Sequence, residues 1–231
     1  DYRIIAISKY LESYFLRKGI STLRVPMLCD NSSVQPNKSQ EDKRLHLFYA
    51  GAPGGKDIIG NVIKALALLP EEEQNKIEFS IFGCTKEYLI STCGIASEDI
   101  NMVQNMLQIY GRVSRKEVIE KMSIADFVVL PRNAELRYAK AGFPSKVVEA
   151  LSNATPILCN LSSDLGEYLI DGENAILAKD HEPDSLAEAI YRAMQLTGDD
   201  KRRMSECARD TAEKFFDYRK YSESLYEFIN R

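Results

Sequence analysis

The feature that most constrains this sequence is the alternation of short apolar runs with stretches of helical periodicity. Each run is about 4–6 residues long and is bounded by Gly, Pro, Asn or charged residues. Such runs predict strands buried on both faces, and their alternation with helices predicts βα units that form a parallel sheet. Eight runs fit the pattern: 4–8, 22–27, 45–50, 77–82, 107–110, 127–131, 155–159 and 174–178.

The segments between these runs place their apolar residues three or four positions apart, as on one face of a helix. In 57–69, for example, Ile59, Val62, Ile63 and Leu66 share a stripe. The same spacing occurs in 9–18, 114–123, 184–195 and 200–215. The sequence therefore predicts an α/β fold with a doubly wound, Rossmann-like parallel sheet.

Composition divides the chain unevenly. Residues 30–44 contain almost nothing apolar and are predicted to be a linker. The segment before it, 1–29, has two strands and one helix, too little to bury a core, so we expect it to be the remnant of a preceding domain. Residues 45–215 hold enough elements for a complete domain, and the aromatic tail 216–231 is expected to form a C-terminal helix.

Charge and composition exclude several kinds of protein. The net charge of -4 argues against sequence-independent nucleic-acid binding, which needs a positive surface. No apolar run is long enough for a transmembrane helix, and no signal peptide is expected. The five cysteines show no zinc spacing and fit a reducing cytoplasm, so we expect a cytoplasmic protein without a metal or cofactor. With only two histidines, a Ser-His-Asp triad is improbable.

The turn after the expected strand 45–50 is rich in glycine and opens directly onto a helix. Glycines permit close backbone approach, and a helix N-terminus favours an anion, so the turn could cradle a phosphate. It is not a Walker A loop, because Ala50 stands where the first glycine belongs and Asp57 replaces Ser or Thr. A tight turn with a solvated lysine explains the segment equally well. The candidate phosphate-binding residues are Gly51, Ala52, Gly54, Gly55 and Lys56.

A second candidate segment follows the expected strand 127–131. Four cations lie between Arg132 and Lys146, and the segment then enters a helix that contains Glu149. Lys146 and Glu149 are three apart and share a helix face, where one could meet a phosphate and the other sugar hydroxyls. A surface ion pair between the two is the alternative.

Location favours the binding interpretation. Ligands of open parallel sheets bind beyond the carboxyl ends of the strands, near the point where the strand order reverses. We therefore expect the two segments to converge on one diphosphate, with Glu149 beside it.

After the strand 155–159, Ser162, Ser163 or Asp164 is expected to cap the next helix.

These motifs together resemble the C-terminal domain of GT-B glycosyltransferases of group 1, family 4. The resemblance covers nearly the whole chain and is carried by Tyr49–Asp57 and by the Pro-Ser-Lys signature in 142–150, followed by 154–157 and 171–175. It implies that 1–29 ends the N-terminal GT-B domain. It further implies that Glu149 contacts the donor ribose and that Lys56, with Lys146 and Arg132, holds the diphosphate.

The resemblance also implies a reaction. A sugar would pass from a nucleoside-diphosphate sugar to a hydroxyl of an acceptor glycan or lipid-linked glycan, with retention and without a metal, in polysaccharide or glycoconjugate biosynthesis. The acceptor site, the catalytic groups and any peripheral membrane association would belong to the missing domain, so this fragment is expected to turn over weakly or not at all.

Two departures from the family pattern leave the identity of the sugar open, and the fold allows other functions. Ala141 stands where the family often has a second glutamate, and the arginine common near Gly51 and Ala52 is missing. A nucleotide-sugar epimerase of the same fold is one alternative, and a non-catalytic nucleotide-binding or interaction module is the other.

Overall fold

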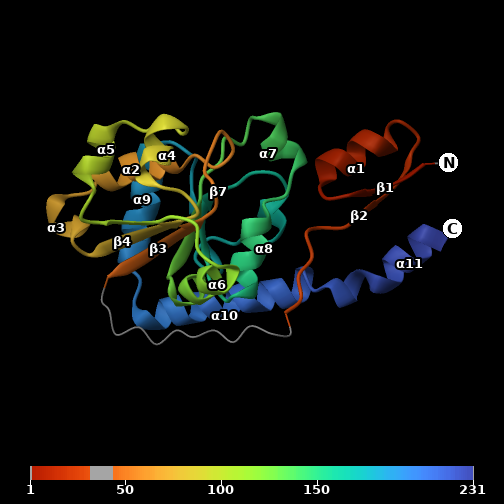
Figure 1. Cartoon of the computed structure of the whole chain (residues 1–231). Coiled ribbons are helices and arrows are strands. Elements are labelled where there is room, and N and C mark those ends of the chain that lie inside the picture. Colours follow the sequence, from red (N-terminus) through yellow and green to blue (C-terminus); the bar gives the residue numbers. More distant parts are fainter. Residues whose placement is uncertain (1, 32–43, 231) are drawn as a thin grey trace.

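The computed structural model describes residues 2–31 and 44–230, and a six-stranded sheet forms its centre (Figure 1). All neighbouring strands are parallel, and their order is β5-β4-β3-β6-β7-β8. The doubly wound α/β prediction is confirmed. The strands are β3 (Leu45–Ala50), β4 (Ile77–Phe82), β5 (Leu107–Tyr110), β6 (Phe127–Leu130), β7 (Ile157–Asn160) and β8 (Ala175–Ala178).

The strand order reverses between β3 and β6, which lie side by side at the centre of the sheet. From β3 the chain moves outward through β4 to β5, then returns to β6 and moves outward through β7 to β8. In open parallel sheets, ligands bind beyond the carboxyl ends of the strands at such a reversal.

Helices cover both faces of the sheet (Figure 1). Helix α2 packs against α9 and α5, and α8 packs against α10. The core between sheet and helices is apolar, with Phe48, Phe79 and Phe127 almost fully buried. The helices of this unit are α2 (Ile59–Ala67), α3 (Glu71–Gln74), α4 (Lys86–Ser91), α5 (Ser97–Met102), α6 (Arg115–Ile124), α7 (Arg137–Ala141), α8 (Ser145–Ser152), α9 (Pro183–Met194) and α10 (Gly198–Phe215).

The expected strands all occur, with ends that differ by a few residues. The long amphipathic helices also occur close to their expected positions. Helices α3, α4, α5 and α7 were not predicted, because each has only 4–6 residues. A segment of that length completes too few turns to show a helical period.

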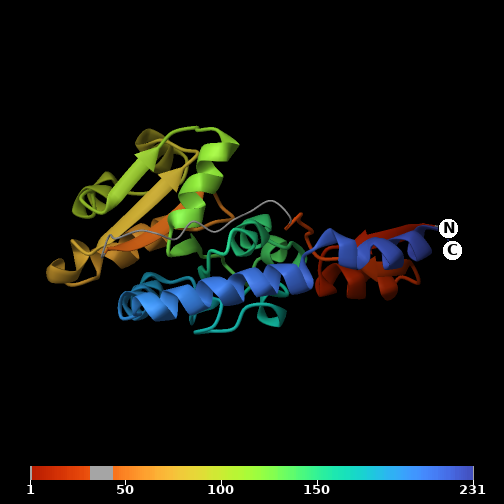
Figure 2. The ribbon, with the colours of Figure 1, turned by 90° about the horizontal axis from the view of Figure 1, so that it is seen from below.

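The N-terminal segment forms a separate small unit. Strands β1 (Arg3–Ala6) and β2 (Ser21–Arg24) pair in parallel, and helix α1 (Lys9–Leu16) connects them. Figure 2 shows helix α11 (Ser222–Asn230) beside this unit, with the two chain ends close together. The Arg3 guanidinium donates to the carbonyl oxygens of Phe228 and Ile229 at 2.7 and 3.0 Å.

The expected helix at 216–231 begins later than predicted. Phe216 is fully buried at the end of α10, and a 3-10 turn, Tyr218–Tyr221, precedes α11. The end of α10 lies beside the segment that follows β2, because the Phe216 carbonyl accepts from the amide of Cys29 at 2.8 Å. Most of the expected linker 30–44 lies outside the described residues.

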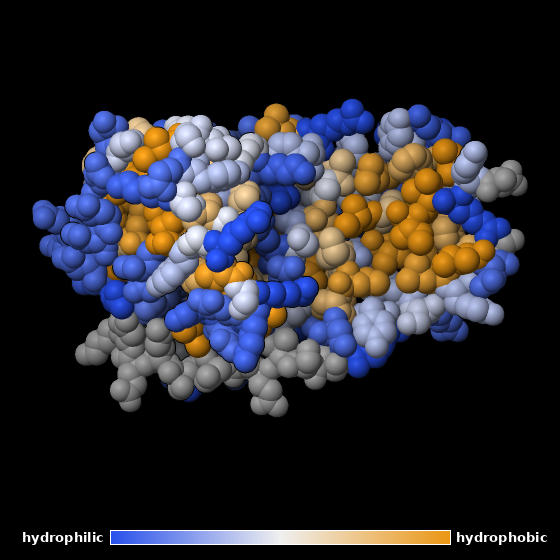
Figure 3. Space-filling model, viewed as in Figure 1, coloured by the Kyte–Doolittle hydropathy of each residue, from blue (hydrophilic) through white to orange (hydrophobic). Residues whose placement is uncertain are grey.

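Apolar side chains remain exposed on the N-terminal unit. Ile5 in β1 is 51% exposed, and Figure 3 shows a broad apolar area on the side of the molecule where this unit lies. The large exposed apolar side chains of the N-terminal segment and α11 are Tyr2, Ile5, Tyr10, Tyr14, Leu16, Tyr226 and Ile229.

Candidate functional site

A buried carboxylate lies at the carboxyl end of β3. Asp57 is 5% exposed and accepts hydrogen bonds from Lys146 Nζ at 2.8 Å, Arg132 Nε at 3.0 Å and the Tyr49 hydroxyl at 3.0 Å. Tyr49 belongs to β3, Arg132 follows β6, and Lys146 lies in the first turn of α8. Asp57 therefore joins three elements that are far apart in the sequence.

The charges of this cluster are well defined. Burial opposes ionisation of Asp57, but hydrogen bonds and charges from Lys146 and Arg132 outweigh it and lower the pKa of the carboxyl. Burial, reinforced by the Asp57 charge, raises the pKa of Tyr49 and keeps its phenol neutral. One carboxylate thus faces two cations, which leaves one net positive charge in this cluster.

The two candidate turns meet directly. The Tyr138 hydroxyl, on α7, donates to the carbonyl oxygens of Gly55 at 2.8 Å and Lys56 at 3.1 Å. The amide of Ile58 donates to the carbonyl of Pro131 at 3.0 Å. The turn after β3 and the loop after β6 therefore share one edge of the sheet.

The glycines of the first turn differ in what they require. Gly51 has φ +144°, a backbone conformation that residues with a side chain rarely adopt, and a Cβ there would also lie 2.9 Å from Lys146 Cε. A Cβ at Gly54 or Gly55 would meet nothing within 4 Å. The backbone conformation therefore favours glycine at 51, whereas neither packing nor a positive φ requires it at 54 or 55.

Beside this cluster lies a hollow of about 340 Å³ at the carboxyl ends of β3, β4 and β5. It brings together Glu149 and Gly51 from the predicted set. It also includes two arginines that the sequence did not single out, because they follow β5 and belong to no motif. Its lining is Ala50, Gly51, Phe82, Gly83, Arg112, Val113, Arg115, Val118 and Glu149.

The remaining predicted residues are less engaged. Ala52 and Lys56 are exposed, and within the described parts of the chain the Lys56 ammonium makes no hydrogen bond or ion pair. Lys146 pairs with Asp57, and no pairing between Lys146 and Glu149 occurs among the described residues. The alternative interpretation, a surface ion pair between Lys146 and Glu149, is therefore wrong.

Asn160 is a further residue that the sequence did not assign to the site. It is 3% exposed at the end of β7; its side-chain oxygen accepts from the amide of Arg132 at 2.9 Å, and its nitrogen donates to the Arg132 carbonyl at 2.8 Å. This pair of bonds fixes the backbone from which the Arg132 side chain reaches Asp57.

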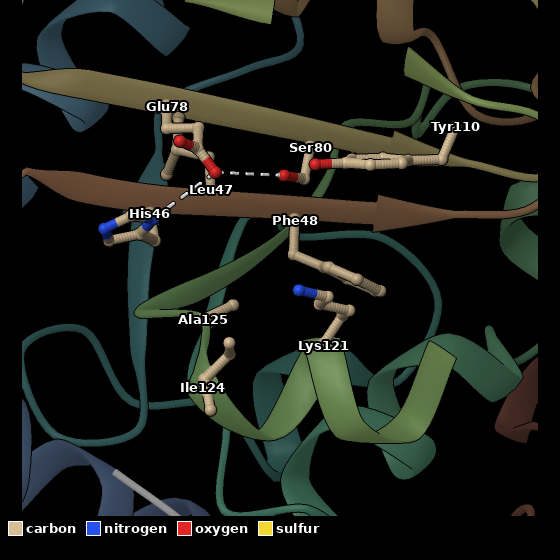
Figure 4. Close-up of a pocket in the computed structure, with 9 residues that line it drawn as sticks. All are labelled: His46, Leu47, Phe48, Glu78, Ser80, Tyr110, Lys121, Ile124 and Ala125. Atoms are coloured by element: carbon tan, nitrogen blue, oxygen red, sulfur yellow. Dashed lines mark hydrogen bonds and ion pairs between the residues drawn. The ribbon is translucent and has the colours of Figure 1, made fainter. Parts of the chain in front are cut away.

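A second, smaller hollow of about 70 Å³ lies between the sheet and α6 (Figure 4). Glu78 there accepts from Ser80 Oγ at 3.4 Å and lies 3.7 Å from His46 Nδ1, and Lys121 points from α6 toward the sheet. It contains none of the predicted site residues. The candidate site is the Asp57 cluster with the 340 Å³ hollow beside it, because the two together contain Lys146, Arg132, Gly51 and Glu149 from the predicted set.

The expectation that Ser162, Ser163 or Asp164 caps the next helix is wrong. No side chain caps the 3-10 helix Leu165–Glu167. Asp164 instead accepts from the amide of Lys9 at 2.8 Å, at the N-terminus of α1. It caps a helix that precedes it by about 150 residues, because the N-terminal unit lies against the loop after β7.

Two features are absent from residues 2–31 and 44–230. No helix there is both long and apolar enough to cross a membrane. No group of three His, Cys, Asp or Glu side chains in these ranges could hold a metal ion.

Comparison with known proteins identifies the relatives of this chain. Residues 31–211 match the family described as Glycosyl transferases group 1. The chain is 30% identical over 217 residues to the uncharacterized glycosyltransferase MJ1178 of Methanocaldococcus jannaschii, an alignment that covers 92% of this chain and 55% of the relative. The chain belongs to the group 1 glycosyltransferase family.

Solved structures share the fold. Sucrose-phosphate synthase from Thermosynechococcus elongatus matches with a TM-score of 0.78 at 18% identity, over 99% of this chain and 57% of that protein. Anabaena Alr3699/HepE in complex with UDP matches with a TM-score of 0.77 at 17% identity, over 98% and 63%. The chain thus has the fold of GT-B glycosyltransferases and spans about half the length of the curated relatives it matches.

Proposed function

We propose that this chain is the donor-binding half of a glycosyltransferase that moves a sugar from a nucleoside diphosphate to an acceptor hydroxyl. The observation that carries the proposal is the meeting of Lys146 and Arg132 on Asp57, directly beside a hollow that contains Glu149. The cations suit a diphosphate, and the hollow lies next to them, where the nucleoside would be placed.

Each part of the site then has a task. Lys146 and Arg132 face the diphosphate, and the exposed Lys56 adds a third cation from the glycine-rich turn. Gly54 and Gly55 allow the backbone amides of that turn to approach the phosphate oxygens. Glu149 accepts hydrogen bonds from the ribose hydroxyls in the hollow.

The chemistry follows from the charges. When the bond between sugar and phosphate breaks, negative charge grows on the leaving diphosphate. Cations that are already in place stabilise that charge without reorganising at the moment of reaction. The reaction proposed is transfer with retention, in the synthesis of a polysaccharide or glycoconjugate in the cytoplasm.

We further propose that residues 1–29 complete a preceding domain that supplies the acceptor site for a glycan or lipid-linked glycan. The exposed apolar side chains of β1 and α1, such as Ile5 and Tyr14, support a preceding domain. Contiguous exposed apolar side chains are typical of a surface that another domain or protein covers. Peripheral membrane association would then belong to that domain, and this chain alone would turn over weakly or not at all.

Calorimetric titration with UDP, GDP and ADP tests the proposal. UDP is the first choice, because the similar Anabaena protein is seen with UDP. We expect one of the three nucleotides to bind at a single site. Failure of all three to bind would contradict the proposed function, and release of a free sugar epimer without an acceptor would favour an epimerase.

A lysine substitution locates the site. Lys56→Ala should cost roughly 1.5–3 kcal/mol of nucleotide affinity, the scale of a hydrogen bond to a charged group. Lys64→Ala is the matched control, because Lys64 lies on α2 beyond the turn and its ammonium is 4.0 Å from Asp99. Equal affinity of the Lys56 variant and the wild type would remove the glycine-rich turn from the site.

A further inference from the structure

The Asp57 carboxylate is fully engaged by the protein itself. Its Oδ1 receives Arg132 through Nε at 3.0 Å and a terminal nitrogen at 2.9 Å, and its Oδ2 receives Lys146 at 2.8 Å and Tyr49 at 3.0 Å. The Asp57 side chain is only 6% exposed. It therefore lacks the access and the free acceptor positions to bind a ligand, and whatever it does for binding it does through the two cations.

Both cations keep donors beyond those that Asp57 uses. An ammonium has three N–H donors and a guanidinium has five, and the bonds to Asp57 occupy one and two of them. Lys146 passes over Gly51, where a Cβ would lie 2.9 Å from its Cε, so glycine at this position leaves room for the lysine side chain. Arg132 is fixed at its backbone by Asn160.

We propose that Asp57 is a positioning residue for the donor: it holds the Lys146 and Arg132 side chains in the directions that a diphosphate requires. The inference rests on the proposed function. Without the carboxylate, two cations whose side chains are only 12% and 25% exposed would lie close together with no counter-charge and would turn toward water. Donor binding would then have to return both side chains to these directions, at a cost in affinity.

Removal of Asp57 also changes the donor affinity in the opposite direction. It takes a negative charge away from the anion site, which by itself tightens anion binding. Because the Asp57 side chain is only 6% exposed, salt screens this effect little. Asp57→Glu, which keeps the charge, therefore separates the loss of position from the loss of charge.

A double-mutant cycle with UDP as the probe tests the inference. In calorimetry at about 0.15 M salt, Asp57→Asn and Lys146→Ala should each weaken UDP binding about 10-fold, the lower end for a hydrogen bond to a charged group. Because Asp57 acts through Lys146, the double variant should be weakened about 10–20-fold and not about 100-fold.

The matched control is Asp126→Asn. Asp126 also accepts from a lysine, Lys201 at 2.9 Å, and from the backbone amide of His46 at 2.9 Å, and its side chain is 20% exposed. It precedes β6, at the end of the strand opposite the candidate site. We expect Asp126→Asn to lower the unfolding temperature while leaving UDP affinity within about twofold of wild type.

The outcomes separate the inference from the proposed function. Unchanged affinity in Asp57→Asn, or single effects that multiply fully in the double variant, overturns the inference alone. Absence of UDP, GDP and ADP binding in the wild type contradicts the proposed function and the inference with it. If Asp57→Asn does not fold, Asp57→Glu keeps the charge but displaces both cations by one methylene; reduced affinity then supports the inference, and wild-type affinity overturns it.

Discussion

The six-stranded unit and the N-terminal unit use parallel strands and helices in the same way, yet they differ in what they bury. Strands β6 and β7 have every residue buried. In β1 and β2, by contrast, Ala6 is the one buried residue, and α1 buries none. The larger unit is stabilised by its own core, whereas the smaller unit depends on contacts with its surroundings.

Polar contacts join the N-terminal unit to segments beyond the carboxyl edge of the large sheet. Arg24 forms two hydrogen bonds with Glu167 and one with Asp164, at 3.0 to 3.1 Å. Ser8 Oγ donates to the carbonyl of Ala141 at 2.6 Å. The small unit is therefore joined by polar contacts to segments next to the candidate site, and Ile7 also packs against the apolar core.

The largest expected effect is on the core of the six-stranded unit. Phe127 is 0% exposed in the central strand β6, so Phe127→Ala should lower the free energy of unfolding by about 3–5 kcal/mol. Ile5→Ala is the counterpart in β1 and should cost under about 1 kcal/mol. Urea titration followed by circular dichroism measures both, and similar losses would contradict the distinction between the two units.

Lowering the pH should destabilise the protein gradually, through protonation of the Asp57 carboxyl at the candidate site. The folded-state pKa of Asp57 is lowered, so its contribution to stability is complete above the pKa of the unfolded chain and is lost as pH falls through the folded-state pKa. We expect the unfolding free energy to fall below about pH 4, with a shallower slope in Asp57→Asn. Equal slopes in both proteins would show that Asp57 does not titrate in this way.

The smallest expected effect concerns the attachment of the N-terminal unit. Arg24→Ala removes the contacts to Asp164 and Glu167, whose side chains are 8% and 30% exposed. The loss should be about 1 kcal/mol and local. Hydrogen exchange should quicken in β1 and β2 while the core strands keep their protection. Faster exchange in β6 as well would mean that the two units unfold together.

Local sequence patterns predicted much of this architecture. The eight strands and the long helices follow from runs and periods that a few residues define, and the glycine-rich turn and the Pro-Ser-Lys segment were both placed after strands. The sequence did not show that Asp57 is the centre of the site. Asp57 directly follows the candidate lysine Lys56, but no local sequence pattern distinguishes a buried carboxylate from an exposed one.

The sequence by itself determined the α/β class, the order of elements and the cations Lys146 and Arg132 as candidates. Tertiary structure alone decided that Lys146 meets Asp57, 89 positions away, and that Asp164 caps α1. The physical reason is that hydrophobic periodicity is a property of neighbouring residues. Charge pairing at the candidate site depends instead on which strand ends the reversal between β3 and β6 brings together.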